Sequence, residues 1–421
     1  MARAFVIGNM SSIACIDQLE SSVNMRTAVR ILVQCTHSRL SIKPLIAGSE
    51  KSKMATTTLE DRNAIRESLS RYLDANSDWA ALRAGFASPR GYVDQIWSNF
   101  ASMGLLGCQL APKFGGVDAG MLDVVAIAEQ IGKRLIPIPY VNTGVVGLEL
   151  LSLACAVNAL PKTIIEQIVA GSKVVAIAGA GPCVPYEDES CVMKVIDSPT
   201  GVTLTGKVKF VPQGGFADYY VLCLKTGLGL EIFFIESSPA VLTQVMQTND
   251  PAQRLAEIDF NDVPAIRLNY QPNTLKSVQS KAIVAAAAEQ LGATRAIFDL
   301  TLEYLRTRYQ FGRPIGSFQA MKHLAAELYL NLEHAASAVY AAAELLEEGG
   351  DQAHRCAALA CFTMKDTFRE ITAHSIQMHG GIAYTQEHVA HLFWRRARSA
   401  ITLFGRPQYH RENYLQSYEV L

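Results

Sequence analysis

The chain has 421 residues, of which 49% are hydrophobic and 18% charged, and its formal net charge is −1. This length allows two or three domains with substantial cores, and the near-neutral charge gives no reason to expect nucleic acid or an anionic membrane as the main partner. No apolar run reaches the roughly 20 residues that a transmembrane helix needs, and nine cysteines without CxxC spacing indicate reduced thiols in a cytosolic-type compartment.

The first 57 residues differ in composition from everything after them. They hold seven Lys and Arg against three Asp and Glu, with many Ser and Thr and no sustained hydrophobic periodicity. An organelle-targeting peptide would be rich in Arg and Ser and poor in acids, yet Asp17 and Glu20 lie inside this stretch. We favour translation starting at Met54 and expect residues 1–57 to be a disordered tail or a mis-assigned start, outside the fold.

Residues 58–167 have the pattern of an N-terminal helical domain. Thr58 precedes two acids that suit the first turn of a helix, and apolar residues then recur every four positions. A second helix is predicted around residues 93–100. A third is predicted from Met121 to Ile131, after a glycine-rich loop.

Residues 168–272 change to short runs of alternating apolar and polar residues, as strands require. Examples are CVMKVID (191–197) and LEIFFIES (230–237), and Gly, Pro, Asp and Ser separate such runs. We expect a middle antiparallel β domain, inserted between two helical parts.

Residues 273–421 return to helical periodicity. A first long helix is predicted to end near Phe311-Gly312, and two more helices are predicted from Phe318 to Leu346 and from Ala353 to Gln377. These long helices, rich in small residues, predict a C-terminal four-helix bundle.

Two motifs in this last part resemble those of the acyl-CoA dehydrogenase family. The first is R-x-x-F-G-x-P-I-x-x-F-Q-x-x-K-H, which begins at Arg308. The second begins at Gln377 and is Q-x-x-G-G-x-x-Y-x-x-E followed, after seven intervening residues, by R. Both occur in order in a chain of the usual family size. The resemblance covers about residues 58–421 and implies an α+β fold with an N-terminal helical domain, a middle antiparallel β-barrel and a C-terminal four-helix bundle that dimerises.

The resemblance also implies that FAD is the cofactor. It assigns to FAD binding six residues in the two motifs: Arg308, Phe311, Gln319, Gln377, Gly380 and Gly381. Arginine suits the pyrophosphate because its planar fork donates two hydrogen bonds, and the glycine pair, expected from a neighbouring subunit, allows close backbone approach. Phe210 stands where relatives have a Trp beside the flavin ring, and it can stack there in the same way. Pro212, however, cannot replace the Thr hydroxyl of relatives. No cluster has metal-ligand spacing, so we predict no metal.

The family reaction needs a carboxylate beside the α-carbon of the substrate. Counting from the motifs, the two positions at which relatives carry this Glu correspond to Phe404 and Ala282, and neither is an acid. Glu289 lies seven residues beyond Ala282, about two turns along the same helix face, and is the candidate for a relocated base. The alternative is a structural Glu289 paired with Arg295 or Lys281.

Three functions remain open from the sequence. The chain resembles bacterial members acting on steroid or other bulky acyl-CoA thioesters, some of them heteromeric. The favoured interpretation is therefore an FAD-dependent acyl-CoA dehydrogenase subunit whose homologous partner supplies the catalytic Glu. The alternatives are a self-sufficient dehydrogenase using Glu289, and a flavin monooxygenase on the same fold. The expected partners are an acyl-CoA substrate, a homologous subunit or a homo-oligomer, and an electron-transfer flavoprotein or similar acceptor. The bacterial cytoplasm is favoured over the mitochondrion.

Overall fold

A computed structural model describes residues 57–157, 159–179, 191–199, 201–227 and 229–417. The expectation for residues 1–56 therefore lies outside the described residues. No described helix is both long and apolar enough to cross a membrane.

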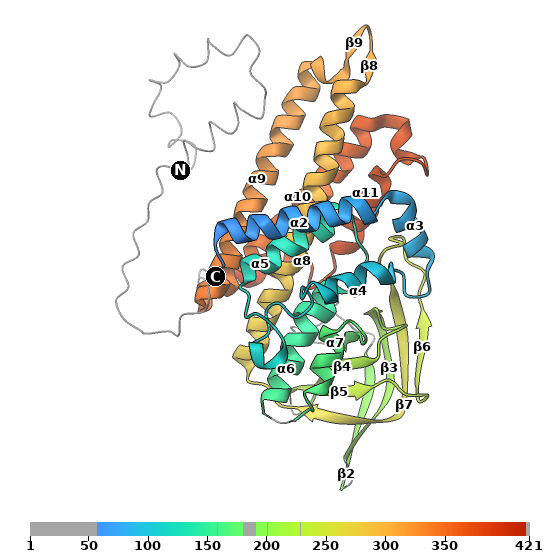
Figure 1. Cartoon of the computed structure of the whole chain (residues 1–421), viewed down its shortest axis with the longest axis vertical. Helices are drawn as coiled ribbons and strands as arrows, with labels where there is room; N and C mark the ends of the chain where they lie inside the picture. The colour runs from blue at the N-terminus through green and yellow to red at the C-terminus, as the bar shows by residue number, and fades with distance from the viewer. Residues whose placement is uncertain (1–56, 158, 180–190, 200, 228, 418–421) are drawn as a thin grey trace, which may run out of the picture. The chain divides into compact units, whose positions relative to one another are not determined.

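Helices fill the N-terminal part up to residue 169 (Figure 1). They are α2 (Leu59–Asn76), α3 (Trp79–Ala87), α4 (Asp94–Ser102), η2 (Pro112–Phe114), α5 (Met121–Lys133), the π-helical η3 (Tyr140–Gly147), α6 (Leu148–Ala156) and α7 (Thr163–Val169). The expected N-cap is confirmed, since the Thr58 side chain accepts a hydrogen bond from the Asp61 backbone N–H, while Asp61 accepts one from the Thr58 N–H.

Seven strands follow in the middle of the chain. They are β1 (Val175–Gly179), β2 (Val192–Ser198), β3 (Gly201–Pro212), β4 (Tyr219–Thr226), β5 (Gly229–Glu236), β6 (Val241–Val245) and β7 (Leu255–Leu268). Their order is β1-β4-β5-β7-β3-β2, with β6 also paired to β7. The long β7 holds the assembly together, because it pairs with β3, β5 and β6.

The expected antiparallel barrel is wrong in two respects. First, β1 pairs with β4 in parallel, because β1 enters beside β4 directly after α7 and runs the same way. Second, β1 and β2 end the strand order on opposite sides, and no pairing between them closes the described sheet. The middle part is therefore an open, mixed sheet. Its strand β3 is irregular, with register shifts against β7 between Leu204 and Gly206 and between Val208 and Val211.

The C-terminal part is helical, as expected. It contains α8 (Pro272–Thr307), the short β8 (Tyr309–Gln310) and β9 (Arg313–Pro314), η4 (Ile315–Ser317), α9 (Gln319–Glu348), α10 (Asp351–His379), η5 (Gly380–Tyr384), α11 (Ala390–Ala400) and α12 (Pro407–Gln416). Helices α8, α9 and α10 pack along one another, α10 also contacts α11 and α12, and α5 packs on α8. The β8–β9 hairpin lies at one end of α8 and α9, and the sheet lies at the other end of α8 (Figure 1).

Candidate active site

A cavity of about 70 Å³ lies where the N-terminal helices, the sheet and the C-terminal helices meet, and it has room for several water-sized groups. The α8 residues on its wall are Ala286, Glu289, Gln290 and Ala293, spaced as one face of a helix requires. The remaining wall residues are Ile136, Pro137, Ile138, Pro139, Val141, Asn142, Gln213, Ala252, Gln253, Arg396, Ala400, Leu403 and Phe404.

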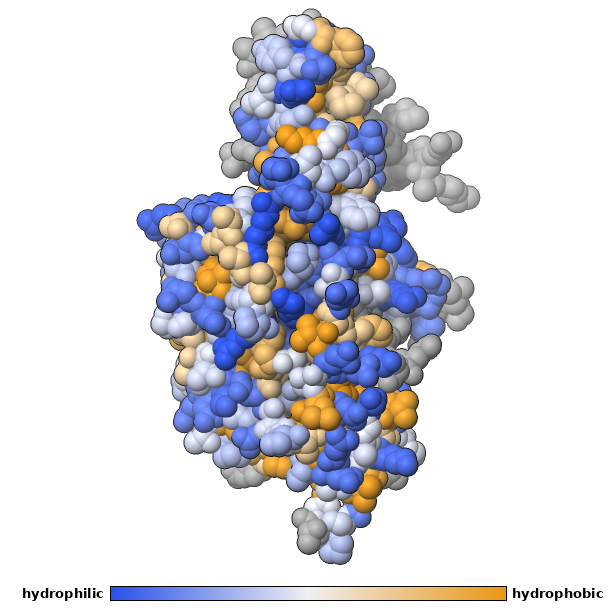
Figure 2. All heavy atoms as spheres, turned by 90° about the vertical axis from the view of Figure 1, so that its right-hand side faces the viewer, coloured by the Kyte–Doolittle hydropathy of each residue, from blue (hydrophilic) through white to orange (hydrophobic). Residues whose placement is uncertain are grey.

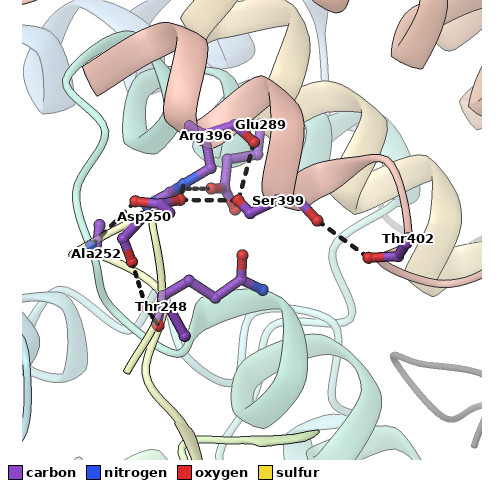
Figure 3. A network of polar contacts seen from close by, with 8 residues as sticks. Thr248, Asp250, Ala252, Glu289, Arg396, Ser399 and Thr402 are labelled. Atoms are coloured by element: carbon purple, nitrogen blue, oxygen red, sulfur yellow. Dashed lines mark hydrogen bonds and ion pairs between the residues drawn. The ribbon is translucent and has the colours of Figure 1, made fainter. Parts of the chain in front are cut away.

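Arg396 of α11 joins two carboxylates at this cavity (Figure 3). Its Nε donates to Asp250 Oδ2 at 2.6 Å and its Nη1 donates to Glu289 Oε1 at 2.7 Å. The Ser399 hydroxyl also donates to Asp250 Oδ2, at 2.9 Å, and the Ala252 N–H donates to Asp250 Oδ1 at 3.0 Å. Asp250 is only 3% exposed, so these bonds compensate the loss of its hydration.

Glu289 is less completely held than Asp250. Its Oε1 accepts from Arg396, whereas Asp250 accepts hydrogen bonds from Arg396, Ser399 and Ala252. The Glu289 side chain keeps 23% exposure on the cavity wall. Burial raises the pKa of Glu289 above its ordinary value, while Arg396 lowers it and Asp250 raises it. Two carboxylates sharing one guanidinium carry a charge of −1 when both are ionised, so a proton on Glu289 brings the cluster to neutrality.

A reciprocal glycine contact fixes the position of Glu289. The sequence AIAEQIG (126–132) in α5 recurs as AAAEQLG (286–292) in α8, and the two helices cross at these segments. A Cβ on Gly132 would lie 1.8 Å from the Glu289 carbonyl oxygen, and a Cβ on Gly292 would lie 1.9 Å from that of Glu129. Only glycine permits backbones this close, so the crossing holds both glutamates in place.

The turn after α11 is held from two sides. The buried Lys365 amine donates to the Leu403 carbonyl oxygen at 2.6 Å and to that of Gly405. His410 Nε2 donates to the Phe404 carbonyl oxygen at 2.6 Å. These bonds maintain Phe404 at φ +55°, a left-handed conformation that a bulky residue rarely adopts. Phe404 is thereby fixed on the cavity wall.

The residues expected to hold the adenosine and pyrophosphate lie elsewhere, at the hairpin end of the helices. Arg308 and Gln319 are exposed there, and Phe311 is 92% exposed. Tyr304 of α8 stacks on His379 of α10 with ring centroids 4.6 Å apart, which brings the Gln377–Gly381 segment to the same end of the same chain. Near the top of Figure 2, where this end lies, apolar and charged residues are interspersed on the surface.

The glycines of that segment leave open backbone, as a cofactor cradle requires. Gly380 has φ +68°, and an added Cβ at Gly380 or Gly381 would meet no atom within 4 Å. Phe210 is separated from this end, because it lies in β3 (Figure 1). It is 41% exposed at φ +56°, inside the second register shift of that strand.

Two family models match the chain. "Acyl-CoA dehydrogenase, N-terminal domain" matches residues 59–157 and "Acyl-CoA dehydrogenase, C-terminal domain" matches residues 282–418. The chain belongs to the acyl-CoA dehydrogenase family. Such enzymes are oxidoreductases that act on CH–CH bonds.

Its relatives include the acyl-CoA dehydrogenase IpdE2 of Mycolicibacterium smegmatis, 29% identical over 354 residues that cover 83% of this chain and 96% of the relative. Mitochondrial isovaleryl-CoA dehydrogenase of Pongo abelii is 23% identical, with 87% and 88% covered. Among solved structures, the ChsE4–ChsE5 complex of Mycobacterium tuberculosis matches with a TM-score of 0.77 at 20% identity, over 87% of this chain and 99% of that one. The FAD complex of PigA matches with a TM-score of 0.77 at 21% identity, over 87% and 100%. Those two structures establish the shared fold.

Ala282 and Phe404, the two positions that the motif spacing aligns with the base of relatives, are both buried. Glu289 lies on the same cavity wall as Phe404. The alternative of a Glu289 paired with Arg295 or Lys281 is wrong, because Glu289 contacts Arg396. Arg295 contacts Glu129 and Lys281 contacts Glu149. At about 100° per residue, Arg295 and Lys281 point well away from the α8 face that carries Glu289.

The sequence reasoning missed Asn142, Gln213 and Gln290, which line the cavity, and also Asp250 and Ser399, which belong to the hydrogen-bond network of Arg396 beside it. Asp250, in TNDPAQ between two predicted strands, has the composition of an ordinary turn. The repeated A-x-A-E-Q-x-G segment was the signal that could have marked the crossing. In the described part of the chain, no group of three or more His, Cys, Asp or Glu residues could hold a metal ion.

Proposed function

We propose that this chain takes part in the FAD-dependent α,β-dehydrogenation of an acyl-CoA thioester to the 2,3-enoyl-CoA. The supporting observation is the cavity itself, which places the carboxylate of Glu289 on one wall with Phe404, the position where relatives carry their base. This arrangement fits removal of an α-proton from a substrate that lies in the cavity.

The exposed residues described above fit FAD. Arg308 offers a bidentate fork to a pyrophosphate, the backbone at Gly380 and Gly381 is open to close approach, and Phe210 offers a ring face. When bound, FAD accepts the hydride from the β-carbon of the substrate. Phe210 lies in the sheet, whereas the other residues lie at the far end of the helices. For one FAD to contact both groups of residues, one group would have to come from a second chain. We therefore expect an oligomer.

The partner that we favour is a homologous chain that supplies the catalytic Glu. Ala282 and Phe404, the positions that the motif spacing aligns with the base of relatives, cannot accept a proton. An electron-transfer flavoprotein or a similar acceptor would take the electrons. The bacterial relatives favour the bacterial cytoplasm as the compartment.

Glu289 is the second candidate for the base, and one observation favours it. Its side chain lines the cavity, and Arg396 remains paired with Asp250 if Glu289 takes up a proton. The proton would thus relieve the like-charge repulsion between the two carboxylates rather than isolate the guanidinium. A self-sufficient dehydrogenase would use this group.

Flavin reduction by acyl-CoA separates the two candidates. If the base comes from a partner, the purified chain alone shows no acyl-CoA-dependent flavin bleaching, and Glu289→Gln leaves the rate of the heteromeric complex within a few-fold. If Glu289 is the base, Glu289→Gln lowers that rate by about 10²–10⁴-fold with the flavin still bound. A chain that binds no flavin with any homologous partner would refute the proposed function as a whole.

A further inference from the structure

Two buried carboxamides on the cavity wall have oxygen atoms without a hydrogen-bond donor. Asn142 is 7% exposed and Gln290 is 5% exposed, and both line the cavity beside Glu289. The Asn142 amino group donates to Gln213 Oε1 at 2.8 Å. Among the described residues, neither Asn142 Oδ1 nor Gln290 Oε1 receives a hydrogen bond. Buried acceptors are normally paired, and leaving them unpaired costs free energy.

The backbone that carries Asn142 is also unusual. It belongs to η3, a π-helical segment in which all eight residues, Tyr140 to Gly147, are buried. The Thr143 hydroxyl donates to the Val175 carbonyl oxygen at 2.9 Å, which fastens this segment to β1. Wide π turns are rare and occur frequently at functional sites. Here the turn holds a carboxamide against the cavity.

The charges on the wall restrict what can pair with these oxygens. Asp250 and Glu289 share the single guanidinium of Arg396, so an anionic group entering the cavity would meet excess negative charge. The surrounding wall is apolar, with Ile138 and Leu403 among its residues. A matching ligand is therefore neutral and mostly apolar, and it carries a hydrogen-bond donor.

We propose that this cavity recognises a hydroxyl group on the acyl chain, so that the substrate class is hydroxylated acyl-CoA thioesters. A hydroxyl serves both carboxamides at once, since it donates to one oxygen and accepts from the amino group of the other after that amide turns by 180°. A ketone, which only accepts, could pair with the amino group of the turned amide but would leave the oxygen of the other carboxamide unpaired. This inference rests on the proposed function, because it treats the cavity as the acyl site.

Paired thioesters test the inference through binding. The flavin-loaded chain, with its homologous partner where one is required, is titrated with ω-hydroxyacyl-CoA thioesters of butyryl to octanoyl length, each against its unsubstituted parent and its ω-carboxy analogue. At the best length the hydroxylated thioester should bind at least about tenfold more tightly than the parent, and the carboxylated one should bind more weakly than either. In Gln290→Met, which keeps the side-chain length, the ratio should fall towards one. The exposed Gln95→Met is the matched control and should keep the full ratio.

Stability provides a second readout. Because Gln290 Oε1 receives no hydrogen bond within the described chain, Gln290→Met should fold and melt at least as high as the wild type. Equal affinity for hydroxylated and parent thioesters, or a preference that survives Gln290→Met, would overturn the hydroxyl inference while leaving the dehydrogenase proposal standing. Failure of every thioester to bind or to reduce the flavin would overturn both.

Discussion

Acidification should destabilise this protein through one buried histidine. His410 is 2% exposed, and burial lowers its pKa to about 4 even though the Phe404 carbonyl accepts its Nε2 proton. In the unfolded chain a histidine titrates near 6.5. At pH values between about 4 and 6.5, His410 is therefore mostly protonated in the unfolded chain and mostly neutral in the folded chain. The stabilisation is therefore fully present above pH 6.5 and is lost as the pH falls towards 4.

The size of the effect follows from the two pKa values. The whole difference is worth about 3 kcal/mol, of which about 2 kcal/mol is lost by pH 5. For the roughly 370 residues after the tail, the entropy of unfolding is about 0.8 kcal/mol per kelvin, so this loss lowers the melting temperature by about 2–3 °C. Thermal unfolding is followed by calorimetry at pH 7.5 and pH 5, in the wild type and in His410→Gln, whose amide can still donate to the Phe404 carbonyl.

The decrease in melting temperature from pH 7.5 to pH 5 should be about 2–3 °C smaller in His410→Gln than in the wild type. The exposed His323→Gln is the control and should show the wild-type drop. Because both proteins share all other titrating groups, the contributions of these groups cancel when the two decreases in melting temperature are compared. If wild type and His410→Gln lose the same amount, the argument from burial is refuted.

Three further predictions concern the helix crossing, the cofactor end and the tail. Gly132→Ala should destabilise by at least about 1–3 kcal/mol, because the new methyl group meets backbone of α8, whereas the control Gly227→Ala, at an exposed position with open space, should change the melting temperature little. Arg308→Ala should weaken flavin retention by about 1.5–3 kcal/mol, the contribution of a charge-assisted hydrogen bond, and unchanged flavin content after gel filtration would count against its assignment. A chain that starts at Met54 should match the full chain in melting temperature and flavin content, and a clear loss of either would show that the tail packs on the fold.

Much of the fold could be predicted because its signals are local. Hydrophobic periodicity gave the helices on both sides of the strands, and a short-range cap gave the start of α2 at Thr58. The openness of the sheet could not be predicted, since it depends on where β1 pairs, and strand pairing joins residues far apart in the chain. The family motifs led to the correct expectation of an acyl-CoA dehydrogenase fold.

The candidate site was predictable only in part, for the same reason. Helix geometry predicted that Glu289 lies on the same helix face as Ala282, and in the structure Glu289 lines the cavity. Its partner Arg396 is 107 residues away, and no local pattern connects the two. Local reasoning offered only Arg295 and Lys281, which lie on other faces of the same helix. The roles of Arg308 and of the glycine pair remain predictions.

The glycine crossing between α5 and α8 also limits how the chain can be recombined with its relatives. The first family model ends before the sheet and the second begins inside α8. These boundaries suggest a chimera in which only one of the two matched segments is replaced by that of a relative. Such an exchange separates Gly132 from the α8 carbonyl that it accommodates. A donor segment with any larger residue there pushes α8 outwards and carries Glu289 with it. The two helical parts, although separated in the chain by the whole sheet, therefore have to be exchanged together if the close helix crossing is to be kept.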